Sequence, residues 1–302
     1  MQKVTAAPAP PVLIVVGCGD LGAAVAAHFA ARGWQVIGVR RSDCVLPGVT
    51  MLAADVTVPS SLQPLRDLRP DYVLMALTPG EFSDRRYREV YVEGARHVLQ
   101  VLDTARVKRV FWVSSTSVYH QDDGEWVDER SPAQPTAFSG RRLLEAEQAI
   151  AASGLAHTSV RFGGIYGPGR DRLLRQLLGG RRSASAPPRY SNRIHRDDAV
   201  GILQFLLDCA ARGSALEPLY LGVDTEPALL DAVEHWYCTY LKDVCGLSVD
   251  YAALTADAPP ARGGSRRCRS ARLQALGYRF IYPTFRQGLP TLLVHGSGNT
   301  QA

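Results

Sequence analysis

Short apolar runs alternate along the first half of the chain with stretches of helical composition. The apolar runs predict buried strands at residues 12–16, 35–39, 51–53, 72–76, 110–113 and 157–162. The stretches between them predict helices at residues 21–32, 61–68, 87–105 and 143–152. Such an alternation is typical of a parallel sheet covered by helices. We therefore expect an α/β fold, a Rossmann-type doubly wound parallel sheet, with ligands at the carboxyl ends of its strands.

Beyond residue 164 the alternation becomes less regular. Helices are expected at residues 172–178, 197–212, 228–242 and 270–276, a Gly/Pro/Ser/Arg-rich loop at 179–191 and a returning strand at 219–223. We interpret this half as a small C-terminal substrate lobe with segments that return to the sheet. The predicted organisation is a flexible N-terminal lead, an NAD(P)-binding Rossmann domain, the substrate lobe and a flexible tail, at residues 1–11, 12–164, 165–290 and 291–302.

The composition is ordinary for a globular protein, with 46% hydrophobic and 21% charged residues, and it excludes a disordered or fibrous chain. The apolar runs are far shorter than the roughly 20 residues of a membrane-spanning helix. Residues 1–11 do not resemble a secretory signal, so we expect a cytoplasmic protein that binds no membrane. The six cysteines are widely spaced, and no metal site is expected.

Charge adds a constraint on partners. The net charge is +5, but the arginines are scattered, which favours one or two anion sites over a nucleic-acid groove. The expected partner is a small-molecule substrate, and the expected oligomeric state is a monomer or a homodimer. Only three of the 34 basic residues are lysines, namely Lys3, Lys108 and Lys242.

A glycine-rich turn follows the first predicted strand. It reads Gly17-Cys18-Gly19-Asp20-Leu21-Gly22, the G-x-G-x-x-G spacing between a strand and a helix. In that motif Gly17 permits the tight turn, Gly19 lets the backbone approach a pyrophosphate, and Gly22 lets helix and strand pack closely. The start of the helix, at Asp20 and Leu21, then offers its N–H groups to the phosphates. The alternative is a glycine-rich turn without a ligand, but the position favours a dinucleotide site.

Charged residues after the next strands indicate the type of dinucleotide. The second predicted strand ends in Arg40 and Arg41, where a protein that prefers NAD usually carries Asp or Glu. Two cations favour the 2′-phosphate of NADP over NAD, although the alternative is that they point to solvent. Asp55 is placed to contact the adenine amino group, and Leu77 and Thr78 lie where the cofactor ribose is expected.

Three later segments carry a resemblance to a known family. They are residues 113–119 (VSSTSVY), 161–170 (RFGGIYGPGR) and 194–199 (IHRDDA). Together with the glycine turn they resemble the extended short-chain dehydrogenase/reductases, the superfamily of NAD-dependent epimerases and dehydratases, and within it the atypical, YeeZ-like members. The resemblance covers about residues 12–290. It implies an NAD(P) cofactor and a polar substrate, which in many members is nucleotide-linked.

The sequence departs from that family at its catalytic pair, Tyr-x-x-x-Lys. One register places Phe138 and Arg142 on the two positions, and a shift of one residue places Ser139 and Leu143 there. No tyrosine of the chain is followed by a lysine four residues later. Phenylalanine has no ionisable proton and arginine stays protonated in proteins, so the ordinary mechanism is not expected.

Other positions of the family's site are retained. The resemblance aligns Ser115 with the catalytic Ser/Thr. Tyr119 and Tyr166 are candidate proton donors, although either can instead pack beneath the substrate loop. Arg142 is expected to bond the nicotinamide ribose, as the family's lysine does. The candidate substrate contacts are Thr116, Arg170 and His195, with a hinge role as the alternative for the histidine.

Two functions therefore stay open. The first is an NADP-preferring oxidoreductase or epimerase-like enzyme with a rearranged proton donor, which the retained Ser115 and the YGPG segment favour. The second is a non-catalytic NADP(H)-binding sensor or interaction protein, which the missing Tyr-Lys pair favours. The sequence does not name the substrate, because loops on a shared fold determine it.

Overall fold

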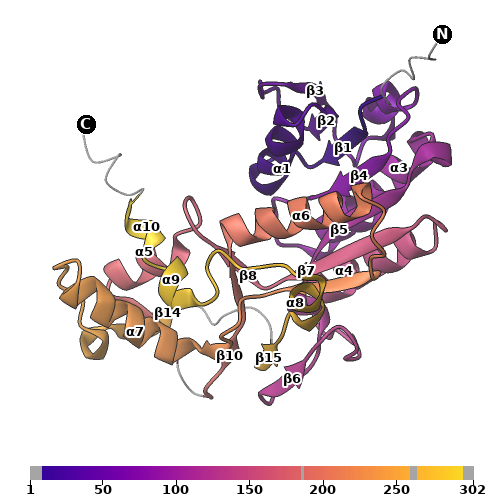
Figure 1. Cartoon of the computed structure of the whole chain (residues 1–302). Coiled ribbons are helices and arrows are strands. Elements are labelled where there is room, and N and C mark those ends of the chain that lie inside the picture. Colours follow the sequence, from indigo (N-terminus) through magenta and orange to yellow (C-terminus); the bar gives the residue numbers. More distant parts are fainter. Residues whose placement is uncertain (1–8, 185–186, 259–263, 295–302) are drawn as a thin grey trace, which may run out of the picture. The chain divides into compact units, whose positions relative to one another are not determined.

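The structure is a computed structural model that describes residues 9–184, 187–258 and 264–294 (Figure 1). The chain divides into two compact units, each built from separated segments. Unit 1 comprises residues 1–113, 145–159 and 206–218, and unit 2 comprises residues 114–144, 160–205 and 219–302. The predicted boundary at residue 164 between a cofactor-binding domain and a substrate lobe stays a prediction. Residues 1–8 of the predicted lead and 295–302 of the predicted tail lie outside the described residues.

A seven-stranded sheet forms the centre of the fold, in the order β12-β7-β5-β4-β1-β2-β3. Its strands are β1 Val12–Val16, β2 Gln35–Arg40, β3 Val49–Ala53, β4 Tyr72–Met75, β5 Arg109–Ser115, β7 His157–Phe162 and β12 Leu219–Gly222. From β3 to β5 every neighbouring pair is parallel. This is the strand order of the doubly wound dinucleotide-binding fold, so the predicted fold class is confirmed.

The central strands are apolar on both faces, as strands covered by helices on both sides must be. Leu13, Ile14, Val15 and Val16 of β1 are fully buried, and so are Val73, Leu74 and Met75 of β4. Burial of such runs stabilises the sheet through the hydrophobic effect. Figure 1 shows α1 (Asp20–Ala31) on one side of these strands and α3 (Gly94–Val101) on the other.

Two helix predictions in unit 1 are wrong in detail. Residues 61–68 were expected to be α-helical, but a 3-10 helix, η1, covers Pro59–Leu65, because Pro64 lacks the N–H that an α-helix needs. Residues 87–105 were expected to form one helix. They are divided among α2 (Asp84–Tyr87), a π-helical segment η2 (Arg88–Glu93), α3 and the 3-10 turn η3 (Thr104–Arg106). The chain leaves α3 at Leu102, which is extended.

Unit 2 contains short strand pairs and helices. The pairs β8–β11, β9–β14 and β6–β15 are parallel, and β10–β13 is antiparallel. The strands are β6 Glu125–Val127, β8 Gly164–Tyr166, β9 Arg181–Ser183, β10 Tyr190–Ser191, β11 Arg193–His195, β13 Ala228–Leu229, β14 Thr255–Ala258 and β15 Arg266–Cys268. The sequence predicted none of these strands. Two of them, β9 and β10, lie within residues 179–191, so the prediction of a loop over that segment was wrong. Strands of two to four residues are too short to show a period in hydrophobicity.

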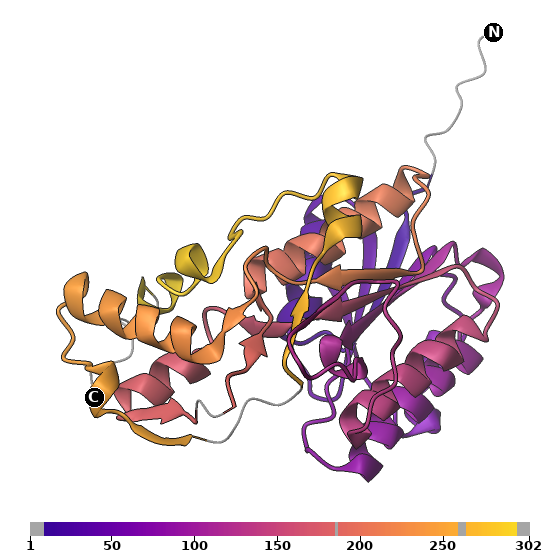
Figure 2. The same ribbon diagram turned by 90° about the horizontal axis from the view of Figure 1, so that it is seen from below.

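The helices of unit 2 agree better with the sequence. They are η4 Thr116–Val118, α5 Arg172–Leu178, α7 Leu230–Asp243, η5 Tyr251–Ala253, α8 Ala271–Leu276, α9 Phe285–Gly288 and α10 Thr291–Val294, while α4 Phe138–Ala151 and α6 Arg196–Ala211 run through both units. Val233, Tyr237 and Leu241 are spaced by four residues and form the buried face of α7. Figure 2 shows α7 in orange beside α5, and the two share an apolar core with Phe285 of α9.

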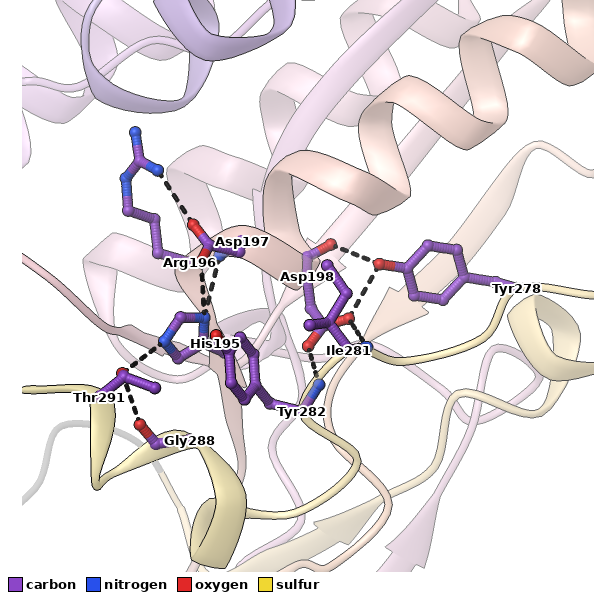
Figure 3. Close-up of polar contacts among 9 residues, drawn as sticks. All are labelled: His195, Arg196, Asp197, Asp198, Tyr278, Ile281, Tyr282, Gly288 and Thr291. Carbon is purple, nitrogen blue, oxygen red and sulfur yellow. Dashed lines mark hydrogen bonds and ion pairs between the residues drawn. The ribbon is translucent and has the colours of Figure 1, made fainter.

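The carboxylate of Asp198 fixes a late segment of the chain to the first turn of α6. Asp198 is fully buried and accepts hydrogen bonds from the backbone N–H groups of Ile281 and Tyr282, both at 2.8 Å, and from the hydroxyl of Tyr278 at 2.9 Å (Figure 3). A buried carboxylate is tolerated where it is fully hydrogen-bonded. One side chain therefore bonds to three residues of the segment 278–282.

Among the described residues, no helix combines the length and the apolar character that crossing a bilayer requires.

Candidate functional site

The glycine turn of unit 1 is packed between the ends of two strands. The backbone N–H groups of Gly17 and Cys18 both donate to the carbonyl of Val39, at 2.9 Å each, which ties the turn to the end of β2. Gly17 has a positive φ of 84°, and a side chain there would run into the carbonyl of Ala76 beyond β4. A Cβ on Gly22 would lie 2.5 Å from the carbonyl oxygen of Gly17. Gly17 and Gly22 are thus required by the fold itself.

Gly19 differs from its two neighbours in the motif. A Cβ at this position would meet no atom within 4 Å, so the fold does not require glycine there. Gly19 is the N-cap of α1, and no side-chain hydrogen bond caps this end of the helix. The helix begins with Asp20, which is exposed, and Leu21, which is buried. An uncapped helix start behind an open glycine fits a pyrophosphate group, which needs close backbone approach and N–H donors.

The glycine turn also lies at the point where the order of the strands in the sheet reverses its direction. The strands β1 and β4 are neighbours, and the chain continues outward from them in both directions, to β2 and to β5. In open α/β sheets the ligand crevice lies outside the carboxyl ends of the strands at this point. Leu77 and Thr78 follow β4 there, the leucine buried and the threonine exposed. The residues predicted to bind a dinucleotide in unit 1 lie at this end of the strands, and their contact with a cofactor stays a prediction.

Arg40 and Arg41 lie at the end of β2, directly after the residue that bonds the glycine turn. Arg40 is half-buried, and its Nη2 donates to the hydroxyl of Ser42 at 3.0 Å, so this contact leaves its charge uncompensated. Arg41 is exposed. Charge-assisted pairing with an anion is the strongest interaction available to such a guanidinium.

Asp55 follows β3 and is held in place by its own turn. Its Oδ1 accepts hydrogen bonds from the backbone N–H of Thr57 at 2.9 Å and from the Thr57 hydroxyl at 2.8 Å. Burial opposes the charge of this carboxyl, but the bonds from Thr57 and the nearby Arg86 and Arg41 hold the pKa of Asp55 below its ordinary value. The sequence reasoning missed Arg86, whose Nε donates to the carbonyl of Pro79 at 3.2 Å. The sequence signal that could have identified Arg86 is its position in the first helix after β4.

In unit 2 the residues of the family's catalytic strand end form a tight turn. Ser115 ends β5, and its hydroxyl oxygen accepts a hydrogen bond from the N–H of Ser117 at 3.2 Å. A side chain on Gly140 would run into the carbonyl of Ser117, so the first turn of α4 packs directly on this segment. On α4, Leu143 is buried, whereas Phe138 and Arg142 are half-buried. The turn and the helix that carry the family's catalytic groups are therefore adjacent here.

A cavity of about 360 Å³ lies within unit 2. Three of the predicted site residues line it together, namely Thr116, Tyr166 and Arg170. The sequence reasoning missed other polar residues of its wall, which are Gln176, Ser183, Arg193, Glu234 and Arg266. No sequence signal marks Arg193 or Arg266, because the strands that carry them are only three residues long. The volume falls within the range of small-molecule sites.

His195 is buried, and both of its ring nitrogens have partners within unit 2 (Figure 3). Its Nδ1 accepts the N–H of Asp197 at 3.1 Å, which leaves Nε2 to donate to the hydroxyl of Thr291 at 3.0 Å. Burial lowers the pKa of His195, against the opposing effect of Asp197 and Asp198, so the neutral ring is favoured. This geometry gives His195 the role of holding α10, and its contact with substrate stays a prediction.

Asp224 is a buried carboxyl that titrates near neutrality. It is 2% exposed, and its Oδ1 accepts one hydrogen bond, from the N–H of Glu226 at 3.2 Å. Burial raises the pKa of Asp224 to about 7, although Arg193 acts in the opposite direction. Because the folded pKa lies above the unfolded one, the folded protein binds this proton more tightly, and the contribution to stability is lost as pH rises from about 4 to 7.

We expect Asp224→Asn to weaken the pH dependence of stability. The asparagine cannot lose a proton, so the decrease in the free energy of unfolding between pH 5 and pH 8 should be smaller than in the wild type by about 1–2 kcal/mol. Urea denaturation at the two pH values measures this. Asp43→Asn, at an exposed position, is the matched control and should behave as the wild type. Equal pH dependence in the wild type and Asp224→Asn would contradict the assignment.

The features described above also match a known protein family. The model of the NAD dependent epimerase/dehydratase family matches residues 12–206, from β1 into α6. The chain belongs to this family. Its membership accounts for the glycine turn, the strand order and the segment around Ser115, and it implies a nicotinamide dinucleotide and a small-molecule substrate. The YeeZ-like resemblance is confirmed as well, since protein YeeZ of Escherichia coli K12 is 29% identical over 217 residues, which cover 66% of this chain and 74% of YeeZ.

Two further relatives of this epimerase/dehydratase chain cover nearly its whole length. A Streptomyces protein, 3-diazoavenalumate denitrifying reductase, is 26% identical and covers 92% of this chain and 98% of its own. A solved structure from Methylobacillus flagellatus, provisionally described as an NAD-dependent epimerase/dehydratase, is 36% identical with a TM-score of 0.77, over 96% of this chain and all of its own. The NAD complex of UDP-glucose 4-epimerase from Thermus thermophilus shares the fold at 19% identity, with a TM-score of 0.77 over 95% and 99% of the two chains.

Proposed function

We propose that the protein is an NADP-preferring oxidoreductase that acts on a small polar substrate without the family's tyrosine-lysine pair. The observation that carries this proposal is the position of Arg40 and Arg41, directly after Val39, whose carbonyl binds the glycine turn. A dinucleotide whose pyrophosphate lies at Gly19 would have its adenosine ribose near the end of β2. A 2′-phosphate there gains two cations, whereas NAD leaves them unpaired. The similarity to a Streptomyces reductase supports reduction as the reaction class.

The preference for NADPH is expected to depend on Arg40. One charge-assisted contact is worth roughly 1.5–3 kcal/mol, so NADPH should bind about ten- to a hundredfold more tightly than NADH. Arg40→Asp should reverse the preference, because a carboxylate repels the 2′-phosphate and accepts from a ribose hydroxyl. Calorimetric titration of both cofactors measures this. Arg96→Asp, at an exposed position on α3, is the control and should keep the wild-type ratio. Equal affinities for the two cofactors in the wild type would reject the proposal.

The nicotinamide supplies or accepts a hydride when it is bound, and the protein must handle the accompanying proton. In the register that places Phe138 and Arg142 on the family's pair, both side chains are half-buried on one face of α4, four residues apart. The other register would place the buried Leu143 on the lysine position. We therefore assign the first register. Phe138 transfers no proton, and Arg142 can orient a ribose but cannot lower the pKa of a tyrosine that is missing.

Two hydroxyl groups have a role in the proposed reduction. In this proposal Ser115 polarises a carbonyl, as its aligned residue does in the family. Tyr166 lines the cavity of unit 2, and burial raises the pKa of its hydroxyl well above the ordinary value, so it stays protonated at neutral pH. A neutral tyrosine donates a hydrogen bond but is a poor reversible acid–base group. Epimerisation, which needs fast proton transfer in both directions, is therefore not the proposed activity.

Restoring the family's pair is expected to raise reductase activity and to leave cofactor binding unchanged. We expect Phe138→Tyr combined with Arg142→Lys to oxidise NADPH with a trial carbonyl substrate about tenfold faster than the wild type, since general acid–base catalysis contributes that much or more. The dissociation constant of NADPH should stay within about twofold. Ser139→Tyr with Leu143→Lys tests the other register. Rapid epimerisation of UDP-glucose by the wild type that survives both Tyr119→Phe and Tyr166→Phe would contradict this account.

A second candidate function is a non-catalytic NADP(H)-binding sensor or interaction protein. The observation in its favour is the same Phe138, which removes the proton donor and leaves the turn at Gly19 in place. The two functions differ in one measurement. A sensor binds NADPH with the preference predicted above but shows no oxidation of NADPH with any carbonyl compound, before or after Phe138→Tyr with Arg142→Lys.

A further inference from the structure

Arg193 belongs to a short strand pair in unit 2 that orients its side chain. The strands β8 and β11 are parallel, with Arg193 beside Gly164 and His195 beside Tyr166. Since side chains alternate along a strand, Arg193, His195 and Tyr166 share one face of the pair. The T-shaped contact of the Tyr166 and His195 rings, 5.4 Å between centroids, agrees with this arrangement. Gly164 contributes no side chain, so nothing from β8 lies beside Arg193.

The guanidinium of Arg193 is buried, and one of its nitrogens lacks a hydrogen-bond partner among the described residues. The residue is 8% exposed, and within the described part of the chain its Nη1 has no hydrogen-bond partner. Its guanidinium carbon lies 6.0 Å from the centre of the Phe285 ring. Burial lowers the pKa of Arg193, with Asp224 and Tyr166 acting in the opposite direction. A buried donor without a partner costs free energy, and such groups in native proteins are explained by a water, an ion or a ligand.

Two further polar atoms near Arg193 also lack partners. The hydroxyl of Tyr166 and the Oδ2 of Asp224 are buried, and neither forms a hydrogen bond within the described residues. The hydroxyl of Tyr166 and the guanidinium of Arg193 are both donors, and both residues line the cavity. Asp224 does not line it, and its carboxyl is already partly protonated near neutral pH. Two donors that belong to cavity-lining residues therefore lack an acceptor among the described residues.

Two other charged residues of the cavity wall, Glu234 and Arg266, form hydrogen bonds, although the Nε of Arg266 is buried without a partner among the described residues. Glu234 is fully buried and accepts hydrogen bonds from the Ser183 hydroxyl at 2.7 Å and from the Gln176 amide at 3.0 Å. Arg266 donates from Nη1 to the carbonyls of Tyr119 at 2.6 Å and Gln121 at 3.1 Å. The wall also includes Arg170 and Arg172, which are exposed, and Arg189, which pairs with Asp122 at 3.7 Å. Its apolar side chains are Ile165, Leu173, Leu230 and Leu289. An occupant with one acceptor group and an apolar body would match these surroundings.

We propose that this cavity binds a carboxylic acid with an apolar body, whose carboxylate pairs with the guanidinium of Arg193 and accepts a hydrogen bond from the hydroxyl of Tyr166. The inference rests on the proposed function in one respect, since this acid would be the substrate or part of it. A carboxylate matches the planar fork of a guanidinium in charge and in geometry. A phosphate dianion fits less well, because Asp224 and Glu234 both act on Arg193 from nearby and would repel a second negative charge.

The wild-type protein alone tests the ligand class. The probes are 3-phenylpropanoate, its amide 3-phenylpropanamide, and 2-phenylethyl phosphate, which present a carboxylate, a neutral group and a phosphate on similar bodies. Binding is measured by calorimetry without cofactor and again with saturating NADPH. We expect the carboxylate to bind about tenfold or more tightly than the amide, and more tightly than the phosphate. Equal binding of acid and amide, or tighter binding of the phosphate, would overturn the proposal.

Variants then locate the contact. Arg193→Met keeps the length of the side chain and removes its charge, and it should reduce the affinity for 3-phenylpropanoate about tenfold or more, while leaving the affinity for the amide unchanged. Tyr166→Phe should cause a smaller loss, again for the acid only. Arg175→Gln, an exposed position on α5, is the control for general loss of positive charge and should bind as the wild type. Unchanged affinity of Arg193→Met for the acid would place the carboxylate elsewhere.

The two proposals fail in different measurements. Equal binding of NADPH and NADH overturns the proposed function. The acid site still stands if the wild type binds the acid more tightly than the amide and Arg193→Met does not. If NADPH is preferred but acid and amide bind equally, the acid site is overturned and the cofactor preference stands. The comparison of probes on the wild type needs no variant, so it decides even if Arg193→Met does not fold.

Discussion

Replacing Gly19 with valine is expected to abolish the binding of both NADPH and NADH while the protein still folds. A Cβ at this position meets no protein atom within 4 Å, so the valine has room in the protein itself. The same space is where a pyrophosphate would approach the start of α1, and a branched side chain excludes it. We expect a loss of affinity of at least about a thousandfold, or ~4 kcal/mol, for each cofactor. Calorimetric titration measures it.

The neighbouring glycines provide the contrast. Gly22→Ala places a Cβ 2.5 Å from the carbonyl oxygen of Gly17 and 3.0 Å from the Val15 side chain, so this variant should lose fold stability. Gly19→Val should lose only about 1 kcal/mol, because valine is a poor N-cap residue. Thermal denaturation separates the two kinds of loss. Undiminished cofactor binding by Gly19→Val would mean that the pyrophosphate does not lie at this turn.

The second large effect is expected at Asp198. Asp198→Ala removes the carboxylate that accepts hydrogen bonds from the backbone N–H groups of Ile281 and Tyr282, and these two donors then lose their partner. The hydroxyl of Tyr278 loses one acceptor and keeps the backbone carbonyl of residue 198 at 3.2 Å. Each such donor costs about 1–3 kcal/mol, so we expect the variant to lose about 3–5 kcal/mol of the free energy of unfolding. For a protein of ordinary stability this is a large fraction of the total. Urea denaturation measures the loss directly.

The adjacent aspartate is the control for that experiment. Asp197 is exposed enough to pair with Arg196 at the surface, where an ion pair is worth about 1 kcal/mol or less. Asp197→Ala should therefore change stability by less than about 1 kcal/mol. Hydrogen exchange at Ile281 and Tyr282 provides a second readout, since their amides should lose protection in Asp198→Ala. Protection equal to that of the wild type would show that other contacts hold this segment.

The sequence predicted the sheet well because buried parallel strands are continuous apolar runs. Runs such as Val12–Val16 and Tyr72–Met75 are recognisable without any tertiary information, and so is the glycine turn between strand and helix. Unit 2 was predicted less well, because its paired strands are two to four residues long and several are polar, such as Arg181–Ser183. Their positions depend on partners distant in sequence, which periodicity does not reveal.

The residues of the candidate site were likewise predicted only in part. Gly19 and Arg40 could be proposed as dinucleotide residues from the sequence because they lie at fixed distances from strands. Thr116, Tyr166 and Arg170 were predicted individually, but that they line one cavity follows only from the folded unit. Arg193 was not predicted, since its importance is that it is buried with an unbonded nitrogen. Burial of a charged side chain is a tertiary property and leaves no pattern in the chain.

The order in which the chain supplies its sheet has a consequence for synthesis on the ribosome. The outermost strand, β12, comes from Leu219–Gly222, in a chain of 302 residues. Unit 1 likewise needs residues 206–218 to be complete. In the nascent sheet the side of β7 therefore stays uncovered while residues 163–222, including α6, are translated. At about 5–20 residues per second this interval lasts several seconds, during which an apolar strand edge is exposed to chaperones and to other nascent chains.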